Sequence, residues 1–217
     1  KKWHKELFYN LEKDFCEFEW VHLSKKEDFN ITVLNKIRPD KIFIPHWSYI
    51  IPKEIFENFE CVVFHMTDLP YGRGGSPLQN LIVRGHEETK ISALKVQEGL
   101  DAGPVYLKRG LSLLGNAQDI FLRASDVIEQ MITQIITDNI CPIPQKGKPV
   151  IFIRRKPEQG NIQGLDTIQE IYNYIRMLDA DGYPSAFLEF GDFKLEFSQA
   201  NIQSKKSILA NVRIIKK

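Results

Sequence analysis

The stretch CVVFHMTDLPYGRGGSP, residues 61–77, decides the fold expected for this chain. Its first four residues are all apolar, which is typical of a strand buried on both faces, as in a parallel sheet. His65 follows directly, and a glycine-rich loop covers residues 70–77. In α/β proteins, ligands bind beyond the carboxyl ends of the strands. We therefore expect His65 and the loop to border a ligand site.

Upstream of this stretch, strand-like and helix-like segments alternate. Residues 18–23 and 41–45 are interpreted as strands, and residues 29–37 and 52–59 as helices. Pro39 ends the first helix, because the residue before a proline resists α-helical geometry. Pro52 suits the first turn of the second helix, where its missing N–H costs nothing. This alternation predicts an α/β fold with a Rossmann-like, doubly wound, mostly parallel sheet.

Downstream, we expect a helix over residues 78–84, strands over 90–96 and 105–114, and an amphipathic helix over 117–138. A proline-rich linker follows. The remainder predicts a small α+β appendage, with a helix over residues 167–178 and strands over 186–190, 193–199 and 207–214. The predicted organisation is thus a catalytic domain (1–140), a linker (141–150) and a small C-terminal domain (151–217). Since α/β domains normally open with a strand, we also expect one to precede residue 1.

Composition limits the classes of function. The 29 Lys and Arg balance 28 Asp and Glu, a net charge of +1, whereas proteins that hold nucleic acid usually carry a basic excess. The three cysteines show no CxxC spacing, so we expect neither disulfides nor a zinc site, and a cytoplasmic location. No apolar run approaches the roughly 18 residues of a membrane helix. Dinucleotide and ATP fingerprints are also missing.

His65 and Asp101 are the candidate catalytic pair. Asp101 lies in the loop EGLDAGP, residues 98–104, between Gly99 and Gly103. A histidine can accept a proton from an attacking amine, and a carboxylate can orient it and stabilise its charged form. By spacing alone, a capped strand end and a turn aspartate are the commoner explanation of the two residues.

The longer pattern resembles a known family. FHMTDLPYGRGGSPLQNLI (64–82) followed by GHEETKISALKVQEGLDAGP (85–104) is similar to the glycinamide-ribotide and methionyl-tRNA formyltransferases, with the sugar-nucleotide N-formyltransferase branch as the expected closer relatives. PHWSYIIP (45–52) resembles the segment that holds the pterin ring. RRKPEQGNI (154–162) and YIRMLDADGYPSAFL (174–188) resemble the start of the family's C-terminal domain.

The resemblance implies a folate-dependent transferase with N10-formyltetrahydrofolate as donor and no metal. His65 would assist proton transfer, and Asp101 would orient His65 or a water. Two further sets of residues are implied, although core packing or loop shaping would also explain them. The cofactor-binding set is Trp47, Tyr49, Ile50, Ile51, Gly99 and Leu100. The substrate-binding set is Thr67, Arg73, Gly74, Ser76 and Gln79.

One position departs from the family pattern. The family has an asparagine two residues before the histidine, where its amide polarises the formyl oxygen, and this chain has Val63. Valine cannot donate a hydrogen bond. Four residues are candidates to replace the asparagine: His46, Thr67, Gln79 and Asn80. We favour His46 as a third catalytic residue, although it could equally line the pocket.

For the acceptor, the short C-terminal part and the balanced charge favour a small molecule. By analogy with the sugar branch, we expect a nucleotide-linked amino sugar as the acceptor. Our first choice is a UDP-linked 4-amino-4,6-dideoxy-N-acetylhexosamine, a precursor in surface polysaccharide biosynthesis of the pseudaminic type. Nucleic acid and membrane are not expected as partners, and a homodimer is left open. The alternatives are formyl transfer to Met-tRNA or glycinamide ribotide, and a non-catalytic folate-binding homologue, which Val63 keeps open.

Overall fold

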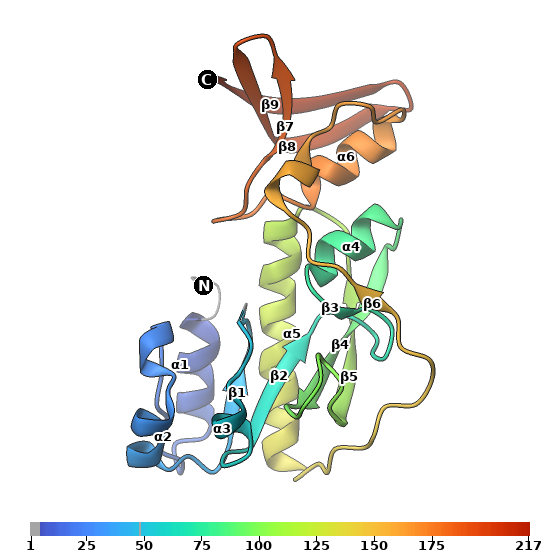
Figure 1. Ribbon diagram of the computed structural model, residues 1–217. Helices are drawn as coiled ribbons and strands as arrows, with labels where there is room; N and C mark the ends of the chain where they lie inside the picture. The colour runs from blue at the N-terminus through green and yellow to red at the C-terminus, as the bar shows by residue number, and fades with distance from the viewer. Residues whose placement is uncertain (1–4, 48) are drawn as a thin grey trace. The chain divides into compact units, whose positions relative to one another are not determined.

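The computed structural model describes residues 5–47 and 49–217. Figure 1 labels the helices and strands. The α-helices are α1 (Lys5–Asp14), α2 (Ile31–Ile37), α3 (Lys53–Phe56), α4 (Pro77–Val83), α5 (Ala117–Thr137) and α6 (Ile168–Arg176). The strands are β1 (Ile42–Ile44), β2 (Cys61–His65), β3 (Arg73–Gly74), β4 (Glu88–Lys95), β5 (Val105–Ser112), β6 (Ile151–Phe152), β7 (Ala186–Phe190), β8 (Phe193–Ser204) and β9 (Ser207–Lys216). Short 3₁₀ turns cover Lys26–Asp28 and Pro157–Gly160.

The chain forms two compact units that interleave along the sequence. The first unit holds residues 1–73, 90–111 and 122–151, and the second holds 74–89, 112–121 and 152–217. The first unit thus contains β2, with His65, and the loop that carries Asp101. The domain boundaries predicted at residues 140 and 150 stay a prediction.

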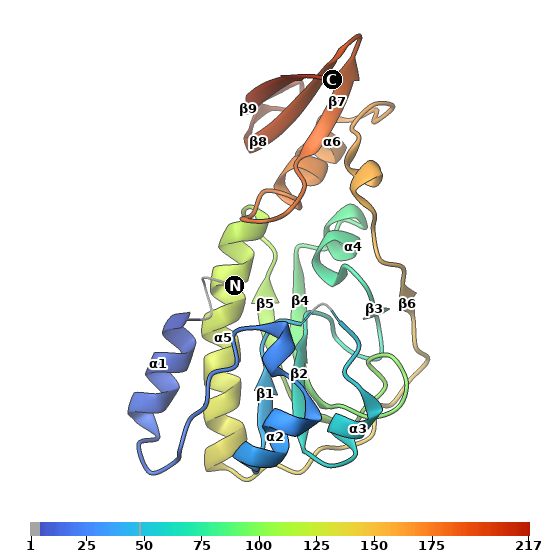
Figure 2. The same ribbon diagram turned by 60° about the vertical axis from the view of Figure 1, so that its left-hand side comes forward.

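A four-stranded sheet in the order β1-β2-β4-β5 positions the candidate site. β1 and β2 are parallel, with Ile44 opposite Val63, whereas β4 runs antiparallel to β2, with Ser92 opposite His65. Figures 1 and 2 show the long helix α5 lying along one side of these strands. The carboxyl end of β2, and with it His65, lies at the edge of the sheet from which the glycine-rich loop departs.

Apolar side chains from the helices and strands of the first unit form a core on both faces of the sheet. α2 is held in place by Asn30, whose side chain accepts a hydrogen bond from the Val33 amide, as an N-cap residue should. One cluster joins α2 and α3 to β1 and β2, and its buried members are Leu34, Ile44, Ile51, Ile55 and Cys61. α1 lies beside α5, and the Asn10 amide donates to the Glu129 carboxylate.

The second unit contains the antiparallel sheet β7-β8-β9, with α6 in contact with β8, β9 and α4. A reciprocal capping box between Thr167 and Glu170 begins α6. Near its end, the buried Arg176 donates to the carbonyls of Leu113 and Gly115, which ties α6 to the turn before α5. This buried cation is therefore satisfied by carbonyl oxygens and has a structural role.

The α/β class and the α+β C-terminal part predicted from the sequence are confirmed. The strand predicted over residues 18–23 is wrong, since this segment forms neither helix nor strand and the side chains of Phe18 and Val21 are exposed. Without a neighbouring strand its apolar residues have no sheet to join. The strand predicted over residues 90–96 is present as β4, but its antiparallel direction was not predicted. Ser48, in the predicted cofactor segment, lies outside the described residues.

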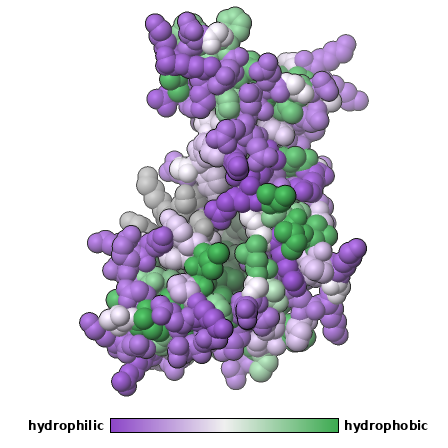
Figure 3. All heavy atoms as spheres, viewed as in Figure 1, coloured by the Kyte–Doolittle hydropathy of each residue, from purple (hydrophilic) through white to green (hydrophobic). Residues whose placement is uncertain are grey.

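The surface carries separate apolar groups. On the face in Figure 3, most side chains are hydrophilic and apolar ones gather in small patches. Scattered exposed apolar residues are normal on proteins, so exposure alone does not mark a site. Within residues 5–47 and 49–217, no helix has both the length and the apolar character needed to cross a membrane.

Ile55 tests the core that supports β1 and β2. Its side chain is 0% exposed, whereas that of Ile50 is 88% exposed. Ile55→Ala leaves a cavity in the cluster, so we expect the free energy of unfolding to fall by about 2–5 kcal/mol. The matched control Ile50→Ala should change it by less than about 0.5 kcal/mol. Urea denaturation followed by circular dichroism measures both, and equal effects would contradict the packing described.

Candidate active site

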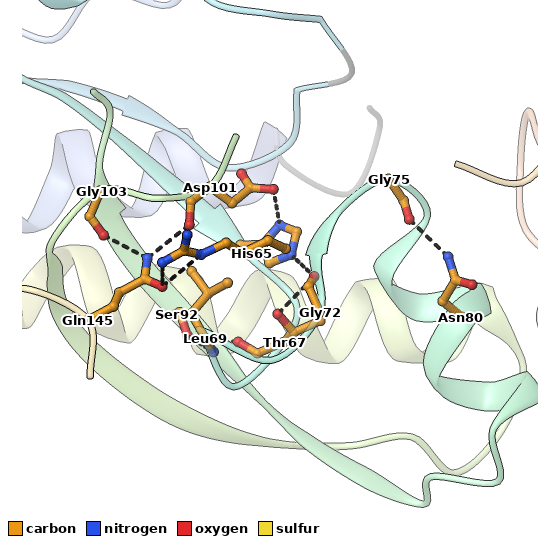
Figure 4. Close-up of polar contacts among 11 residues, drawn as sticks. His65, Thr67, Leu69, Gly72, Gly75, Asn80, Ser92, Asp101, Gly103 and Gln145 are labelled. Atoms are coloured by element: carbon orange, nitrogen blue, oxygen red, sulfur yellow. Dashed lines mark hydrogen bonds and ion pairs between the residues drawn. The ribbon is translucent and has the colours of Figure 1, made fainter. Parts of the chain in front are cut away.

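His65 ends β2 with its ring held on two sides. The ring is buried, and Ser92, its partner across the sheet, donates to the Thr67 carbonyl while accepting from the Leu69 amide. The His65 Nε2 atom lies 2.8 Å from the Gly72 carbonyl oxygen, and the Nδ1 atom lies 3.6 Å from Asp101 Oδ2. Figure 4 shows the ring between these two groups.

These contacts determine which nitrogen of His65 carries the proton. A carbonyl oxygen can only accept, so His65 must donate to Gly72 through Nε2–H. In the neutral ring Nδ1 is then the basic nitrogen, and it faces the Asp101 carboxylate. If Nδ1 gains a proton, the carboxylate 3.6 Å away stabilises the positive charge. The site can therefore accept a proton at Nδ1, the chemistry of a general base.

Asp101 approaches His65 from a turn in a left-handed backbone conformation. Its φ angle is +46°, and that of Gly99 is +96°. Aspartate and asparagine tolerate this region better than other side-chain-bearing residues, at a cost of about 1–2 kcal/mol. The loop therefore needs contacts that hold it in this conformation, and it makes two.

The first contact is the close approach of Gly103 to β4. A Cβ atom on Gly103 would lie 1.7 Å from the Lys95 carbonyl oxygen, which is far inside van der Waals contact. The Lys95 amide also donates to the Pro104 carbonyl at 2.9 Å. Only glycine fits here, so the glycine after Asp101 fixes the distance between the loop and the sheet.

The second contact comes from Gln145, which the sequence placed only in a linker. Its Nε2 atom donates to the carbonyls of Asp101 (2.9 Å) and Gly103 (2.7 Å). Its Oε1 atom accepts from Arg73 Nε and Nη2 at 3.1 and 2.8 Å. Figure 4 shows Gln145 reaching the loop from the side away from His65. No sequence motif marked this residue, because a single glutamine among prolines carries no recognisable pattern.

The predicted cofactor residues divide by exposure. Tyr49, Ile50 and Leu100 are exposed, at 56%, 88% and 58%, whereas Ile51 is buried in the core cluster. Trp47 is half-buried and packs edge-on against Phe29 and Tyr49, and its indole Nε1 is buried with no hydrogen-bond partner among the described residues. Cofactor binding by this set stays a prediction.

The predicted substrate residues mostly make contacts within the protein. Thr67 is fully buried and its hydroxyl donates to the Gly72 carbonyl. Arg73 binds Gln145, as described. In the second unit, Ser76 accepts from the Arg155 amide, Gln79 donates to the Met177 carbonyl, and a Cβ on Gly74 would lie 2.3 Å from the Phe152 carbonyl oxygen. Substrate binding by these five residues stays a prediction.

Two titratable groups on or directly after β2 are unsuited to catalysis. Burial alone would raise the pKa of the Asp68 carboxyl, but hydrogen bonds from Lys108 and Lys90 outweigh it and hold this pKa below its usual value. Asp68 is therefore a neutralised anion and not a second acid. Burial raises the pKa of the Cys61 thiol to about 12, so it stays protonated and cannot act as a nucleophile at neutral pH.

Val63 lies on β2, and His46 follows the end of the neighbouring strand β1. Ile44 pairs with Val63, and His46 follows Ile44 by two residues as His65 follows Val63. The half-buried Val63 packs against the core cluster and has no polar atom in its side chain. His46 and His65 thus come at the ends of two neighbouring parallel strands, which keeps His46 as a candidate donor.

No group of three or more His, Cys, Asp or Glu side chains is placed to hold a metal ion in the described ranges, residues 5–47 and 49–217.

Comparison with known proteins identifies relatives along most of the chain. Residues 6–120 match the family model described as formyl transferase, and residues 157–215 match that of the methionyl-tRNA formyltransferase C-terminal domain. A solved methionyl-tRNA formyltransferase from Clostridium thermocellum is 48% identical, with a TM-score of 0.96 over 100% of this chain and 96% of that one. HypX from Aquifex aeolicus in complex with tetrahydrofolic acid is 19% identical, with a TM-score of 0.74 over 92% of this chain and 36% of that one, a likeness of fold.

The methionyl-tRNA formyltransferase of Rickettsia felis is 26% identical over 81% of this chain. The chain spans 59% of the length of that relative.

These comparisons overturn two expectations from the sequence. The sugar-nucleotide branch and its amino-sugar acceptor are contradicted, because the relatives in sequence carry the name methionyl-tRNA formyltransferase. The expectation of a nucleotide-sugar substrate and no nucleic acid is contradicted by the same names. Two arguments misled us: net charge does not report where charges lie, and the short C-terminal part matches a methionyl-tRNA formyltransferase domain after all.

Gly103 provides a test of the loop geometry. Gly103→Ala forces the loop away from the Lys95 carbonyl, so we expect a lower melting temperature and a displaced Asp101. The matched control is Gly110→Ala, since a Cβ on Gly110 would meet nothing within 4 Å. Differential scanning fluorimetry of the two variants, with a crystal structure of the first, measures the effects. A melting temperature equal to that of the control would refute the close approach.

Proposed function

Since the chain belongs to the formyl transferase family, we propose that it transfers a formyl group from N10-formyltetrahydrofolate to the amino group of Met-tRNA. The observation that carries this proposal is the His65–Asp101 pair, with the basic Nδ1 directed at the carboxylate. The names of the relatives support Met-tRNA as the acceptor.

His65 and Asp101 account for the movement of the proton. When the acceptor nitrogen bonds to the formyl carbon, it must lose one proton, and Nδ1 of His65 accepts it directly or through a water. The Asp101 carboxylate then stabilises the imidazolium. The bond between the formyl carbon and N10 of the folate then breaks, and the proton returns to N10, so that tetrahydrofolate leaves. The Nε2–H bond to Gly72 remains throughout, so the ring keeps its orientation during the transfer.

Exposed apolar groups support a site for the donor. Tyr49, Ile50 and Leu100 present apolar surface from two separate segments, and flat ring systems bind against such surface. Trp47 adds a buried indole N–H with no partner in the described residues, an unsatisfied donor that a ligand acceptor would complete. The complex of HypX with tetrahydrofolic acid supports this assignment at the level of the fold.

A basic stretch of the sequence that includes the neighbours of Gln145 supports a nucleic-acid acceptor. Residues 139–157 contain five Lys and Arg and no Asp or Glu. Lys146 and Lys148 are exposed and follow Gln145, the residue in contact with the Asp101 loop. Lysines that project into solvent beside a reaction centre attract the phosphates of a tRNA acceptor stem.

An acceptor panel tests the function. The protein is incubated with N10-formyltetrahydrofolate and, separately, Met-tRNA, glycinamide ribotide or free methionine, and a mass gain of one formyl group is scored. We expect Met-tRNA alone to be formylated. His65→Ala and Asp101→Asn should each reduce the rate by about 10²–10⁴-fold. At position 101 asparagine is a better replacement than alanine, because asparagine also tolerates the left-handed conformation.

Formylation of glycinamide ribotide in preference to Met-tRNA would overturn the acceptor. Folate binding with no transfer to any amine would overturn the enzyme in favour of a non-catalytic homologue. Near-normal activity of either variant would refute the assignment of His65 and Asp101 as the catalytic pair.

His46 is the proposed donor to the formyl oxygen, which gains negative charge as the new bond forms and which Val63 cannot stabilise. Removal of one such donor costs about 10²–10³-fold in kcat. We expect His46→Ala to lower kcat to this extent, with a smaller effect on KM for Met-tRNA. A steady-state assay measures both constants. Unchanged kcat would exclude His46 from catalysis, and a rise in KM alone would leave it a pocket-lining residue.

A further inference from the structure

The hydrogen bonds of Gln145 fix the orientation of its side-chain amide. The Asp101 and Gly103 carbonyls can only accept, so the amide nitrogen must face them, and the Arg73 guanidinium can only donate, so the amide oxygen must face it. Glutamine satisfies both requirements. Glutamate would lack the donor, and asparagine would be one methylene short.

The two carbonyls lie on either side of Ala102, so one nitrogen restrains the backbone that follows the catalytic carboxylate. Asp101 itself has φ +46°, a conformation that external contacts must maintain. On the sheet side the loop is held by Gly103 against Lys95, and on the other side by Gln145. Together the two contacts leave the Asp101 side chain directed at His65, 3.6 Å from Nδ1.

We propose that Gln145, held in turn by Arg73, is a positioning residue that keeps the Asp101 carboxylate directed at His65. The proposal rests on the proposed function for its catalytic consequence. Gln145 touches neither His65 nor the Asp101 carboxylate in these contacts, and it acts through the backbone. A displacement of a catalytic group by about 1 Å can cost about 10²-fold in rate, so loss of the restraint has a large expected effect.

The test compares two glutamines with similar partners. Gln145→Glu keeps an acceptor for Arg73 and removes the donor to the loop. Gln134→Glu makes the same chemical change on α5, where Gln134 also accepts from an arginine (Arg109, 2.6 Å) and donates to Asp138 (3.1 Å). We expect Gln145→Glu to lower kcat for Met-tRNA by about 10²-fold with KM nearly constant, and Gln134→Glu to leave both unchanged. Gln145→Met, which adds no charge, should match Gln145→Glu.

A double-mutant cycle separates positioning from a general structural role. If Gln145 acts through Asp101, then Gln145→Glu causes no further loss of rate in an Asp101→Asn background, measured by single-turnover formylation. An equal loss in both backgrounds would overturn the proposal, as would unchanged kcat in Gln145→Glu and Gln145→Met.

Amide hydrogen exchange provides a readout that needs no activity. Gln145→Glu should accelerate exchange over residues 98–104 and Gln134→Glu should not, because the first alone releases this loop. If the unaltered protein formylates no amine, the proposed function fails, and the exchange experiment still decides whether Gln145 restrains the Asp101 loop. Unchanged exchange over residues 98–104 would refute the restraint.

Discussion

The hydrogen bond from His65 Nε2 to the Gly72 carbonyl, 2.8 Å long, is the contact on which the rest of the site depends. It determines the tautomer, and the tautomer places the basic nitrogen on the side of Asp101. The Gly72 amide in turn donates to the Val150 carbonyl, so the residue that accepts from His65 is itself held by the chain at the end of the linker. A backbone carbonyl is not protonated at neutral pH, so it accepts from His65 at any pH near neutrality. A carboxylate partner could lose this ability by gaining a proton.

The partner on the other side of the ring is held much less directly. Asp101 lies in a left-handed turn, and its position depends on a glycine that fits against β4 and on a glutamine from the linker. The site therefore joins a rigid element, the end of a buried strand, to a loop whose geometry comes from two external contacts. Both kinds of contact are needed, because catalytic groups must be held within a fraction of an ångström of their working positions.

The sequence predicted those parts of the molecule that local pattern determines. The apolar residues of β2, the prolines around α2 and α3 and the long amphipathic α5 place His65 at a sheet edge, and the glycine-flanked Asp101 is recognisable from its loop. The contacts of Gly72 and Gln145 could not be predicted, because one is made by backbone and the other by a side chain 44 positions from Asp101. Residues 18–23 have a strand-like composition and no strand to pair with, which only the tertiary structure decides.

The error over the acceptor has a physical origin in the use of net charge. Five of the 29 Lys and Arg lie in residues 139–157 and none of the 28 Asp and Glu, so the remainder of the chain carries an acidic excess that conceals a local basic stretch. Phosphate binding depends on the local potential, since charges more than about 10 Å away are largely screened at physiological salt. The residues of this stretch that matter most for the proposed function are Lys146 and Lys148, because they adjoin Gln145, which contacts the Asp101 loop. Under the proposed function, one short segment of the chain thus contacts the Asp101 loop and carries the lysines that would attract the acceptor.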